Sequence, residues 1–302
     1  MIQPQYIFNE MEKRKIKEVI FVPGKEPIFK TEEGIESAGG DRVMPDDTRQ
    51  LLISLRQRTT MVNAPLQSEG HFSFGLPGLG RFHVNYFMQR GSYAVVIRKI
   101  SPTPPSFEEL IPDGETIERL KRLIRHKGLF LVISSYTYIN LDIIASIISY
   151  LIQNENKIIY TIELPLTYAF KHENSIIMQR EVGQDVLSLE EALISALRIS
   201  PDFAYVSELQ TSRDLELFLK LVEHGNTVFL PYHAADIHAA LTGLERLATD
   251  HKGFRETISH FLVAIISPKL EQGDIKAVNI IVKDAETEAA IREGRYDEIL
   301  VP

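Results

Sequence analysis

The 302-residue chain has no cysteine, which excludes disulfides and thiolate chemistry and agrees with a reducing cytoplasm. It also lacks an excess of basic residues, because 33 Lys and Arg stand against 41 Asp and Glu, a net charge of −8. An acidic chain of this kind does not offer the broad basic face that nucleic-acid binding requires. Residues 1–19 contain no apolar core behind their charges, so they are not expected to act as a secretory signal.

The first third of the chain predicts an antiparallel β-meander. Its hydrophobic content (44%) and charged content (25%) are ordinary for a globular protein, and the length suggests two domains. Apolar and polar residues alternate with period two from Gly70 to Ile100, interrupted by Gly and Pro turns. Gly75, Gly78 and Gly80 lie between two strands and not before a helix, so they predict a hairpin turn and not a phosphate-binding loop.

The rest of the chain alternates strands with helices, which is typical of an α/β domain with a mostly parallel sheet. Strands are predicted over Lys157–Ile162, Ala204–Val206 and Thr227–Leu230, and after two helices over Lys276–Val282. Helices are predicted over Leu189–Ile199, capped by Ser188, and over Leu215–His224, closed by Gly225. The proline-rich residues 101–107 separate the two halves, because proline fixes φ and cannot continue a strand.

A long apolar stretch runs from Gly128 to Ile152. It predicts a buried strand over Leu129–Ile133, then a polar turn, then a helix from about Leu141. In many nucleotide-binding proteins such a turn wraps a phosphate, using glycines that let backbone N–H groups close on the anion and a lysine that reaches the outer phosphates. The turn in this chain has neither glycine nor lysine. It occupies the place of a phosphate-binding loop without the chemistry of one.

The same stretch is long enough to be considered as a transmembrane helix. Asn140 and Asp142 lie near its middle, and β-branched residues crowd its first half. A carboxylate at the bilayer centre costs about 2.5–3.5 kcal/mol, which favours the buried strand, turn and helix.

Several strings in the chain resemble, in the same order, the motifs of the type IV pilus retraction ATPases, the PilT family of type II/IV secretion motors. The family's hairpin is similar to GLPGLGRFHVNYFMQRG at Gly75–Gly91, and its interdomain connector to PSFEEL at Pro105–Leu110. Further similarities lie at Gln179–Gly183, Ala192–Asp202 and Ala289–Gly294. The resemblance implies an N-terminal PAS-like α+β domain over residues 1–100, a linker over 101–107 and a RecA-like, P-loop NTPase-type domain over 108–302.

The family's phosphate loop, GPTGSGKST, corresponds to nine residues of this chain that share none of its glycines. They are Ser134, Ser135, Tyr136, Thr137, Tyr138, Ile139, Asn140, Leu141 and Asp142. Asn140 stands at the lysine position, and Leu141 stands at the position of the magnesium-binding Ser or Thr. The chain therefore resembles a family member with a degenerate Walker A motif. This resemblance implies a nucleotide site that has lost its phosphate and metal ligands.

The other nucleotide motifs are partly kept. The family's Asp box retains Glu163 and has Leu164 in place of its aspartate, and the Walker B ending retains Glu208 without the Arg-Asp pair that follows it. The His box retains His233 and has Asn226 in place of its first histidine. The resemblance makes Glu208, Glu163 and His233 the catalytic candidates, and satisfied structural side chains are the alternative for all three.

Arg81 and Arg98 match family positions that reach a neighbouring subunit's nucleotide. Without nucleotide we expect them to form intersubunit ion pairs. His83 stands where the family usually has a further arginine, which weakens a nucleotide-sensing role. His233 and His238 have no third ligand at a suitable spacing, so no metal site is predicted.

The missing groups argue against ATP turnover. A triphosphate carries about four negative charges, which Lys, Mg²⁺ and inward N–H groups must offset. Tyr136, Tyr138 and Ile139 do not easily adopt the tight curvature that glycine permits. Because each lost oxyanion donor costs about 2.7–4 kcal/mol in the transition state, we expect no measurable hydrolysis. We also expect no cofactor. ATP and Mg²⁺ are expected to bind only if the family activity survives.

Three functions remain open at this point. The first is a pseudo-ATPase that acts in pilus retraction and twitching motility by assembly or partner binding. The second is an active hexameric ATPase, with an unorthodox phosphate loop, that powers retraction or secretion. The third is a scaffold with no link to pili.

The resemblance also implies a location and partners. It implies a cytoplasmic ring, hexameric in the family, in which one subunit's N-terminal domain packs on its neighbour's C-terminal domain. Co-assembly with an active PilT-like motor and attachment to the inner-membrane platform of the pilus are the partner expectations, with no nucleic acid and no transmembrane segment. The family usually continues through further helices after the segment that resembles Ala289–Gly294, so the chain is expected to be short at this end.

Overall fold

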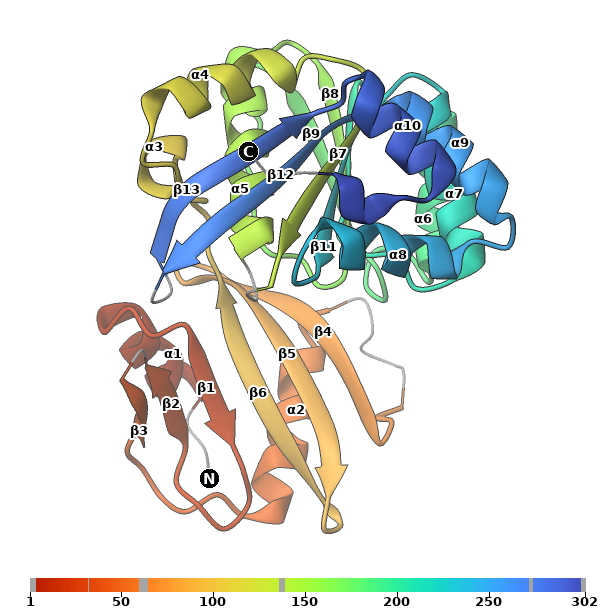
Figure 1. The fold of residues 1–302 in the computed structure, drawn as a ribbon. Helices are drawn as coiled ribbons and strands as arrows, with labels where there is room; N and C mark the ends of the chain where they lie inside the picture. The colour runs from red at the N-terminus through yellow and green to blue at the C-terminus, as the bar shows by residue number, and fades with distance from the viewer. Residues whose placement is uncertain (1–3, 32, 60–64, 136–138, 272–273, 300–302) are drawn as a thin grey trace. The chain divides into compact units, whose positions relative to one another are not determined.

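The computed structural model describes residues 4–31, 33–59, 65–135, 139–271 and 274–299. The chain divides into two compact units (Figure 1). The first comprises residues 1–102 together with Pro165–Ala169, and the second comprises residues 103–164 and 170–302. The segment Pro165–Ala169 belongs to the first unit because Tyr168 forms a β-bridge with Ser101, and the Ala169 N–H donates to the Ser101 carbonyl over 3.2 Å.

The first unit is an antiparallel sheet with two helices, α1 (Pro4–Lys13) and α2 (Pro45–Arg56). Its strand order is β3-β2-β1-β6-β5-β4. The strands are β1 (Glu18–Phe21), β2 (Ile28–Thr31), β3 (Gly34–Ser37), β4 (Glu69–Leu76), β5 (Gly80–Gln89) and β6 (Ser92–Ile100). The predicted meander is therefore confirmed as β4-β5-β6, and Leu76 pairs with Gly80 across the predicted hairpin turn.

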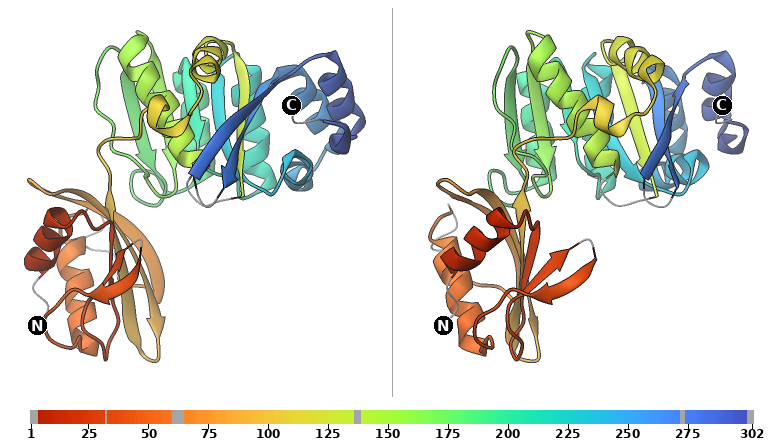
Figure 2. Two further views of the ribbon diagram at one scale, coloured as in Figure 1. Left: turned by 60° about the vertical axis from the view of Figure 1, so that its left-hand side comes forward. Right: turned by 90° about the vertical axis from the view of Figure 1, so that its left-hand side faces the viewer.

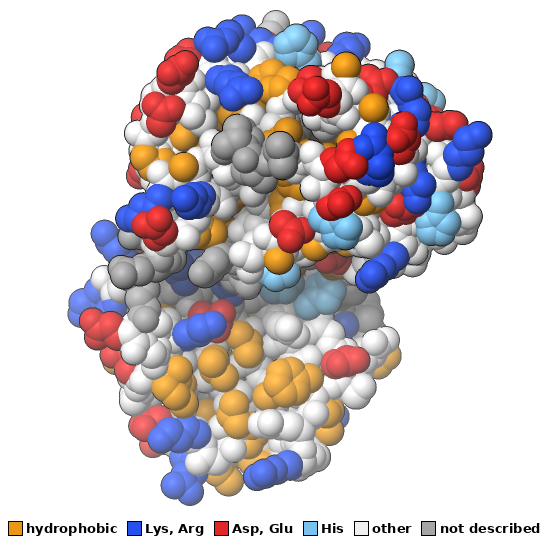
Figure 3. Space-filling model, in the orientation of Figure 1, with side chains coloured by type: hydrophobic (Ala, Val, Ile, Leu, Met, Phe, Trp, Pro, Cys, Tyr) orange, Lys and Arg blue, Asp and Glu red, His pale blue; other side chains and the backbone are white. Residues whose placement is uncertain are grey.

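The core of the first unit is aromatic. The rings of Phe74 and Phe82 stack with centroids 5.4 Å apart, and Phe8 of α1 lies 4.8 Å from Phe82. Phe74 and Phe82 point to the same side of the sheet because they are directly opposite each other in the register of β4 and β5. Figure 3 also shows hydrophobic side chains gathered on the visible surface of this unit, and Ile35, Phe87 and Met88 are exposed by 71%, 42% and 42%.

The second unit is a seven-stranded sheet with the order β13-β12-β7-β11-β10-β8-β9. All neighbours pair in parallel except β12 and β13, which are antiparallel. The strands are β7 (Gly128–Ser134), β8 (Ile158–Glu163), β9 (Ile176–Glu181), β10 (Phe203–Val206), β11 (Thr227–His233), β12 (Leu262–Glu271) and β13 (Asp274–Val282). The prediction of an α/β fold with a mostly parallel sheet is confirmed.

Helices cover both faces of this sheet (Figure 2). They are α3 (Phe107–Leu110), α4 (Gly114–Leu123), α5 (Ile139–Asn154), α6 (Leu189–Ile199), α7 (Ser212–Glu223), α8 (Ile237–Leu247), α9 (His251–Phe261) and α10 (Ala285–Glu293), followed by a 3₁₀ turn at Tyr296–Glu298. The predicted cap is confirmed, because the Glu191 N–H donates to the Ser188 hydroxyl over 3.2 Å. Side-chain caps of this type satisfy N–H groups that lack an intrahelical partner.

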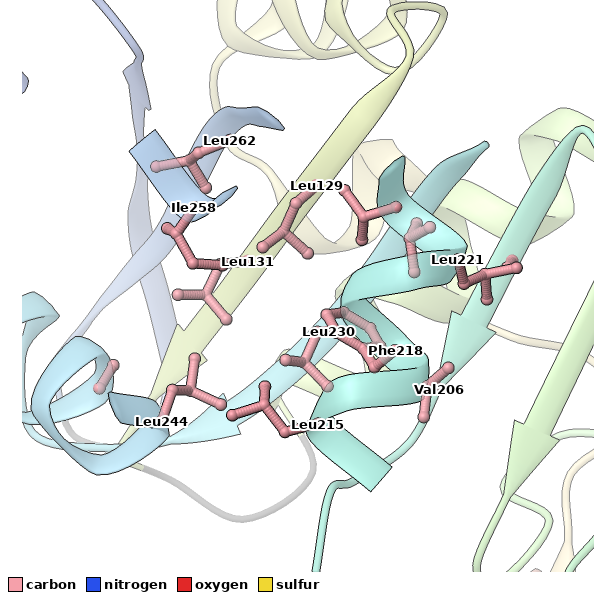
Figure 4. Packing of buried hydrophobic residues seen from close by; sticks show 14 of the residues in the cluster. Leu129, Leu131, Val206, Leu215, Phe218, Leu221, Leu230, Leu244, Ile258 and Leu262 are labelled. Atoms are coloured by element: carbon pink, nitrogen blue, oxygen red, sulfur yellow. The ribbon is translucent and has the colours of Figure 1, made fainter. Parts of the chain in front are cut away.

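Every residue of β7 is buried, and its side chains divide between the two faces. Leu129, Leu131 and Ile133 join the core that includes α6 to α10, whereas Phe130 and Val132 join the core under α3, α4 and α5. Figure 4 shows Leu129 and Leu131 packed among Leu230, Phe218 and the neighbouring helices. The stretch Gly128–Ile152 therefore forms a buried strand and a helix, and no helix among the described residues is long and apolar enough to span a membrane.

The strand β12 was not predicted, because in this region only Lys276–Val282 was expected to form a strand. Pro268 lies within β12, and Pro231 extends β11 beyond its predicted end at Leu230. Both prolines lie at positions where their strand pairs with a neighbour on one side only. Pro268 of β12 is opposite Val278 of β13, and Pro231 of β11 is opposite Val132 of β7. Proline lacks an N–H group, so a strand tolerates it where one side no longer needs a donor.

A buried polar network lies in the second unit and includes Tyr296, near the end of the chain. The Tyr296 hydroxyl donates to Oε2 of Glu245 over 2.7 Å, and Nε of Arg255 donates to Oε1 over 2.8 Å. Burial alone would raise the pKa of the Glu245 carboxyl, but the hydrogen bonds from Tyr296 and Arg255 outweigh burial and hold this pKa below its ordinary value. The network joins α8, α9 and the 3₁₀ turn through one carboxylate.

Tyr296→Phe is expected to lower the free energy of unfolding by about 1.5–3 kcal/mol at pH 7, the usual contribution of a hydrogen bond to a charged group. Because the pKa of Glu245 is lower in the folded state than in the unfolded state, the ionised carboxylate stabilises the fold above its ordinary pKa. That contribution is lost as the pH falls through the folded-state pKa. Urea denaturation of both proteins at neutral and acidic pH tests this, and a difference between them that does not shrink on acidification contradicts it.

Candidate functional site

The positions of the second unit that resemble family motifs lie at one edge of the sheet, where the carboxyl ends of parallel strands meet. The neighbouring strands β7, β11, β10 and β8 all end there (Figure 1). A cavity of about 500 Å³ opens at this edge. Its described lining consists of Asn140, Leu141, Ser207, Glu208, Leu209, Pro231, Tyr232 and His233.

The two ends of the phosphate-loop region are described, and its centre is not. Ser134 is buried at the end of β7 opposite His233 of β11, and its carbonyl accepts the Ala234 N–H over 3.1 Å. Ser135 is exposed, and Tyr136, Thr137 and Tyr138 lie outside the described residues. Helix α5 begins at Ile139, so Asn140, Leu141 and Asp142 belong to its first turn.

Asn140, at the lysine position, is 6% exposed and serves its own helix. Its Oδ1 accepts the Leu141 N–H over 3.0 Å. That N–H is among the first in α5, which lack intrahelical acceptors and which in phosphate sites point at the anion. Asn140 therefore brings no cation to this turn, and its side chain engages one N–H group at the start of the helix.

Glu163 does not line the cavity, although it ends a strand at the same edge. It is 1% exposed, and its Oε1 accepts hydrogen bonds from the Thr161 hydroxyl over 2.7 Å and from Nε2 of Gln179 over 3.1 Å. Two donors from β8 and β9 therefore hold this carboxyl in the sheet. The geometry favours the alternative of a satisfied structural carboxyl for Glu163.

Glu208 lines the cavity and is half-buried. Nε2 of Gln210 donates to its Oε1 over 2.5 Å, and within the described residues no Lys or Arg lies within ion-pair distance of it. The hydroxyl of the preceding Ser207 accepts the Leu164 N–H over 2.9 Å, which ties the segment after β10 to the end of β8. Glu208 is therefore one of two catalytic candidates, with His233, that line the cavity.

His233 and Tyr232 close the cavity from β11. His233 is exposed, whereas Tyr232 is half-buried and packs so closely on α8 that a Cβ added at Gly243 would lie 2.2 Å from its hydroxyl. Burial raises the pKa of the Tyr232 hydroxyl, although the charge of Arg246 opposes this. Tyr232 is not among the site residues predicted from the sequence, and its position beside His233 at a strand end was the available signal. Among the described residues, no group of three metal-ligating side chains includes His233 or His238.

Arg81 and Arg98 lie on the sheet of the first unit. Arg98 of β6 faces His83 of β5 and Glu18 of β1, and Arg81 of β5 faces Gly75 of β4. Both arginines are half-buried. Their contact with a neighbouring subunit stays a prediction.

Comparison with known proteins identifies the family. The model of the type II/IV secretion system protein family matches residues 48–292. Two curated relatives come from Pseudomonas aeruginosa. The type IV pilus ATPase PilU is 25% identical over 290 residues, which cover 93% of this chain and 75% of PilU. The type IV pilus retraction ATPase PilT is 31% identical over 240 residues, which cover 76% of this chain and 68% of PilT.

A solved structure gives the same result for the fold. The crystal structure of the pilus retraction motor PilT with bound ADP superposes with a TM-score of 0.82 and 29% identity, over 99% of this chain and 88% of that one. The ATPase DotB of Legionella pneumophila shares the fold at a TM-score of 0.73 and 16% identity, over 97% of this chain and 86% of DotB. The chain therefore belongs to the type II/IV secretion system protein family and is a PilT-like member of it.

Proposed function

We propose that this chain is a pseudo-ATPase of the type IV pilus motor family, which acts in pilus retraction and twitching motility through assembly with other subunits and not through ATP turnover. The observation that carries the proposal is the state of the first turn of α5. At the lysine position, Asn140 is buried and accepts the Leu141 N–H, while Leu141 occupies the position of the metal-binding hydroxyl. The chain thus lacks the lysine, the metal ligand and one free N–H at the place where phosphates bind in the family.

The charge of the cavity supports the same conclusion. Its described lining contains the carboxylate of Glu208 and neither lysine nor arginine. A triphosphate carries about four negative charges, and a half-buried carboxylate repels it where no cation offsets the repulsion. The charge of the cavity is therefore unfavourable for binding ATP, the substrate of the family's active members.

We propose assembly because the chain retains the fold of the motor family. Both cores of the second unit are complete, and the first unit exposes large apolar side chains at Ile35, Phe87 and Met88. Where such side chains form a contiguous patch, they mark an interaction surface. We propose a cytoplasmic ring, hexameric as the resemblance implies, formed with itself or with an active PilT-like motor at the inner-membrane platform.

Calorimetric titration with MgATP, combined with a steady-state phosphate-release assay, tests the loss of turnover. We expect neither binding heat nor phosphate release from the full chain. Asn140→Lys alone is expected to restore neither, because the lysine would return without the glycine-rich loop that curves around the phosphates.

An active ATPase with an unorthodox loop is the second candidate, because Glu208 lines the cavity. If it is correct, MgATP binds in the micromolar range, phosphate is released steadily, and Glu208→Gln abolishes the release. That result would exclude the pseudo-ATPase. Mass photometry of the chain alone, and mixed with an active PilT-like motor, then tests assembly, which fails if the chain stays a monomer in both samples.

A further inference from the structure

We infer that Pro165–Ala169 is a coupling segment, which passes a displacement of the end of β6 in the first unit to the wall of the cavity in the second unit. The chain crosses from one unit to the other between residues 102 and 103, between 164 and 165, and between 169 and 170. The proline-rich linker is therefore not the only covalent connection between the units. Because this connection does not depend on a ligand, the coupling goes beyond the proposed function and applies to either candidate.

The far end of the coupling segment is part of the first unit. Tyr168 forms a β-bridge with Ser101, which directly follows β6, and the Ala169 N–H donates to the Ser101 carbonyl over 3.2 Å. These contacts are made by backbone atoms, so they depend on the position of the chain and not on the identity of the side chains. A displacement of Ser101 therefore either moves Tyr168 and Ala169 with it or breaks the contacts.

One glutamine side chain holds both ends of the coupling segment to the second unit. Nε2 of Gln179 on β9 donates to Oε1 of Glu163 over 3.1 Å, and Oε1 of Gln179 accepts the Phe170 N–H over 2.9 Å. Glu163 lies two residues before the segment and Phe170 directly after it, so this amide closes the loop between them. Both ends of its dipole are used, which fixes the orientation of the Gln179 side chain.

The start of the coupling segment is bonded to the cavity wall. The Leu164 N–H donates to the Ser207 hydroxyl over 2.9 Å, and the Ser207 N–H donates to the Ile162 carbonyl over 2.9 Å. Ser207 and the next residue, Glu208, line the cavity. Pro165 has a fixed φ and restricts Leu164 to extended conformations, so the segment begins with little rotational freedom. A displacement that reaches Leu164 is therefore passed to Ser207 and Glu208 through a direct hydrogen bond.

Hydrogen–deuterium exchange of the full chain tests the coupling, because a bonded amide exchanges when its hydrogen bond opens. Ala169→Pro removes the N–H that donates to Ser101, and the preceding Tyr168 already lies in a β-bridge, which suits the residue before a proline. We expect the amides of Leu164 and Ser207 to exchange about tenfold faster, the usual effect of losing one hydrogen bond, while the amides of β7 keep their rates. Unchanged rates at Leu164 and Ser207, or an equal rise throughout β7, overturn the inference.

The reverse experiment starts at the cavity. Ser207→Ala removes the acceptor of the Leu164 N–H, and because coupling between two sites is reciprocal, the Ala169 amide is expected to exchange about tenfold faster. Glu173→Pro, which places a proline at an exposed residue beyond the segment, is the matched control for Ala169→Pro and is expected to leave the Leu164 and Ser207 amides unchanged. An unchanged Ala169 amide in Ser207→Ala, or an equal response to the control, overturns the inference. Neither experiment uses nucleotide, so both outcomes are independent of the test for ATP turnover.

Discussion

Replacement of residues 134–142 by the family's loop GPTGSGKST is expected to give the chain micromolar affinity for MgATP, whereas the natural sequence is expected to show none. The replacement restores the lysine at position 140 and the metal-binding hydroxyl at position 141, and it frees the N–H that Asn140 now engages. About three charge-assisted hydrogen bonds of about 1.5 kcal/mol each correspond to roughly a thousandfold in affinity. The surrounding strands β7 and β11 already end at the correct edge of the sheet to hold the loop.

Hydrolysis is expected to remain slow in the same variant. Leu164 still stands at the aspartate position of the Asp box, and the Arg-Asp pair after the Walker B glutamate is still missing. A general base such as Glu208 requires a substrate held in position by such groups. Calorimetry measures the binding and phosphate release measures the turnover.

The control for this experiment is the same loop with alanine in place of the lysine at position 140. It keeps the glycines and loses the cation, so it is expected to bind MgATP far more weakly than the complete loop. If the complete loop also fails to bind in a folded protein, then parts of the cavity beyond the phosphate loop exclude nucleotide. In that case the sequence of residues 134–142 is not what prevents nucleotide binding.

The strand, turn and helix at Gly128–Ile152 could be predicted because local pattern and tertiary role agree there. The strand β7 is buried on both faces, so a continuous apolar run without alternation is what its environment demands. The strand β12 could not be predicted in the same way. Its sequence contains Pro268, which argues against a central strand, and only the pairing with β13 at this point explains why proline is tolerated.

The site was predictable in position and less so in detail. The resemblance to the family's motifs made Glu208 and His233 candidates, and both line the cavity because the carboxyl ends of parallel strands share one edge. The burial of Glu163 depends on Gln179, sixteen residues away on β9, and no local pattern in the sequence indicates that hydrogen bond. The packing of Tyr232 on Gly243 likewise depends on how closely α8 approaches β11, which is decided by the packed fold and not by the strand itself.

Gly128→Ala is expected to destabilise the second unit strongly. Gly128 has φ +132°, and a Cβ at this position would lie 2.3 Å from the Phe261 carbonyl oxygen and 2.8 Å from Cγ2 of Val263. The first atom belongs to the backbone at the end of α9 and cannot move without shifting the start of β12, the neighbour of β7 in the sheet. Overpacking of this kind and the strained φ together cost about 3 kcal/mol or more.

Gly225→Ala separates the clash from the backbone strain. Gly225 also has a left-handed φ of +80°, but the nearest atom to an added Cβ is Nζ of the flexible Lys127 at 3.9 Å. We therefore expect Gly225→Ala to cost only about 1 kcal/mol, the lower end of the cost of a left-handed residue. The chain has no tryptophan, so circular dichroism and tyrosine fluorescence in urea are the measurements. Equal losses in the two variants would mean that β7 and β12 can separate at their start, and the cavity at the other end of β7 would then lack the rigid strand on which its geometry depends.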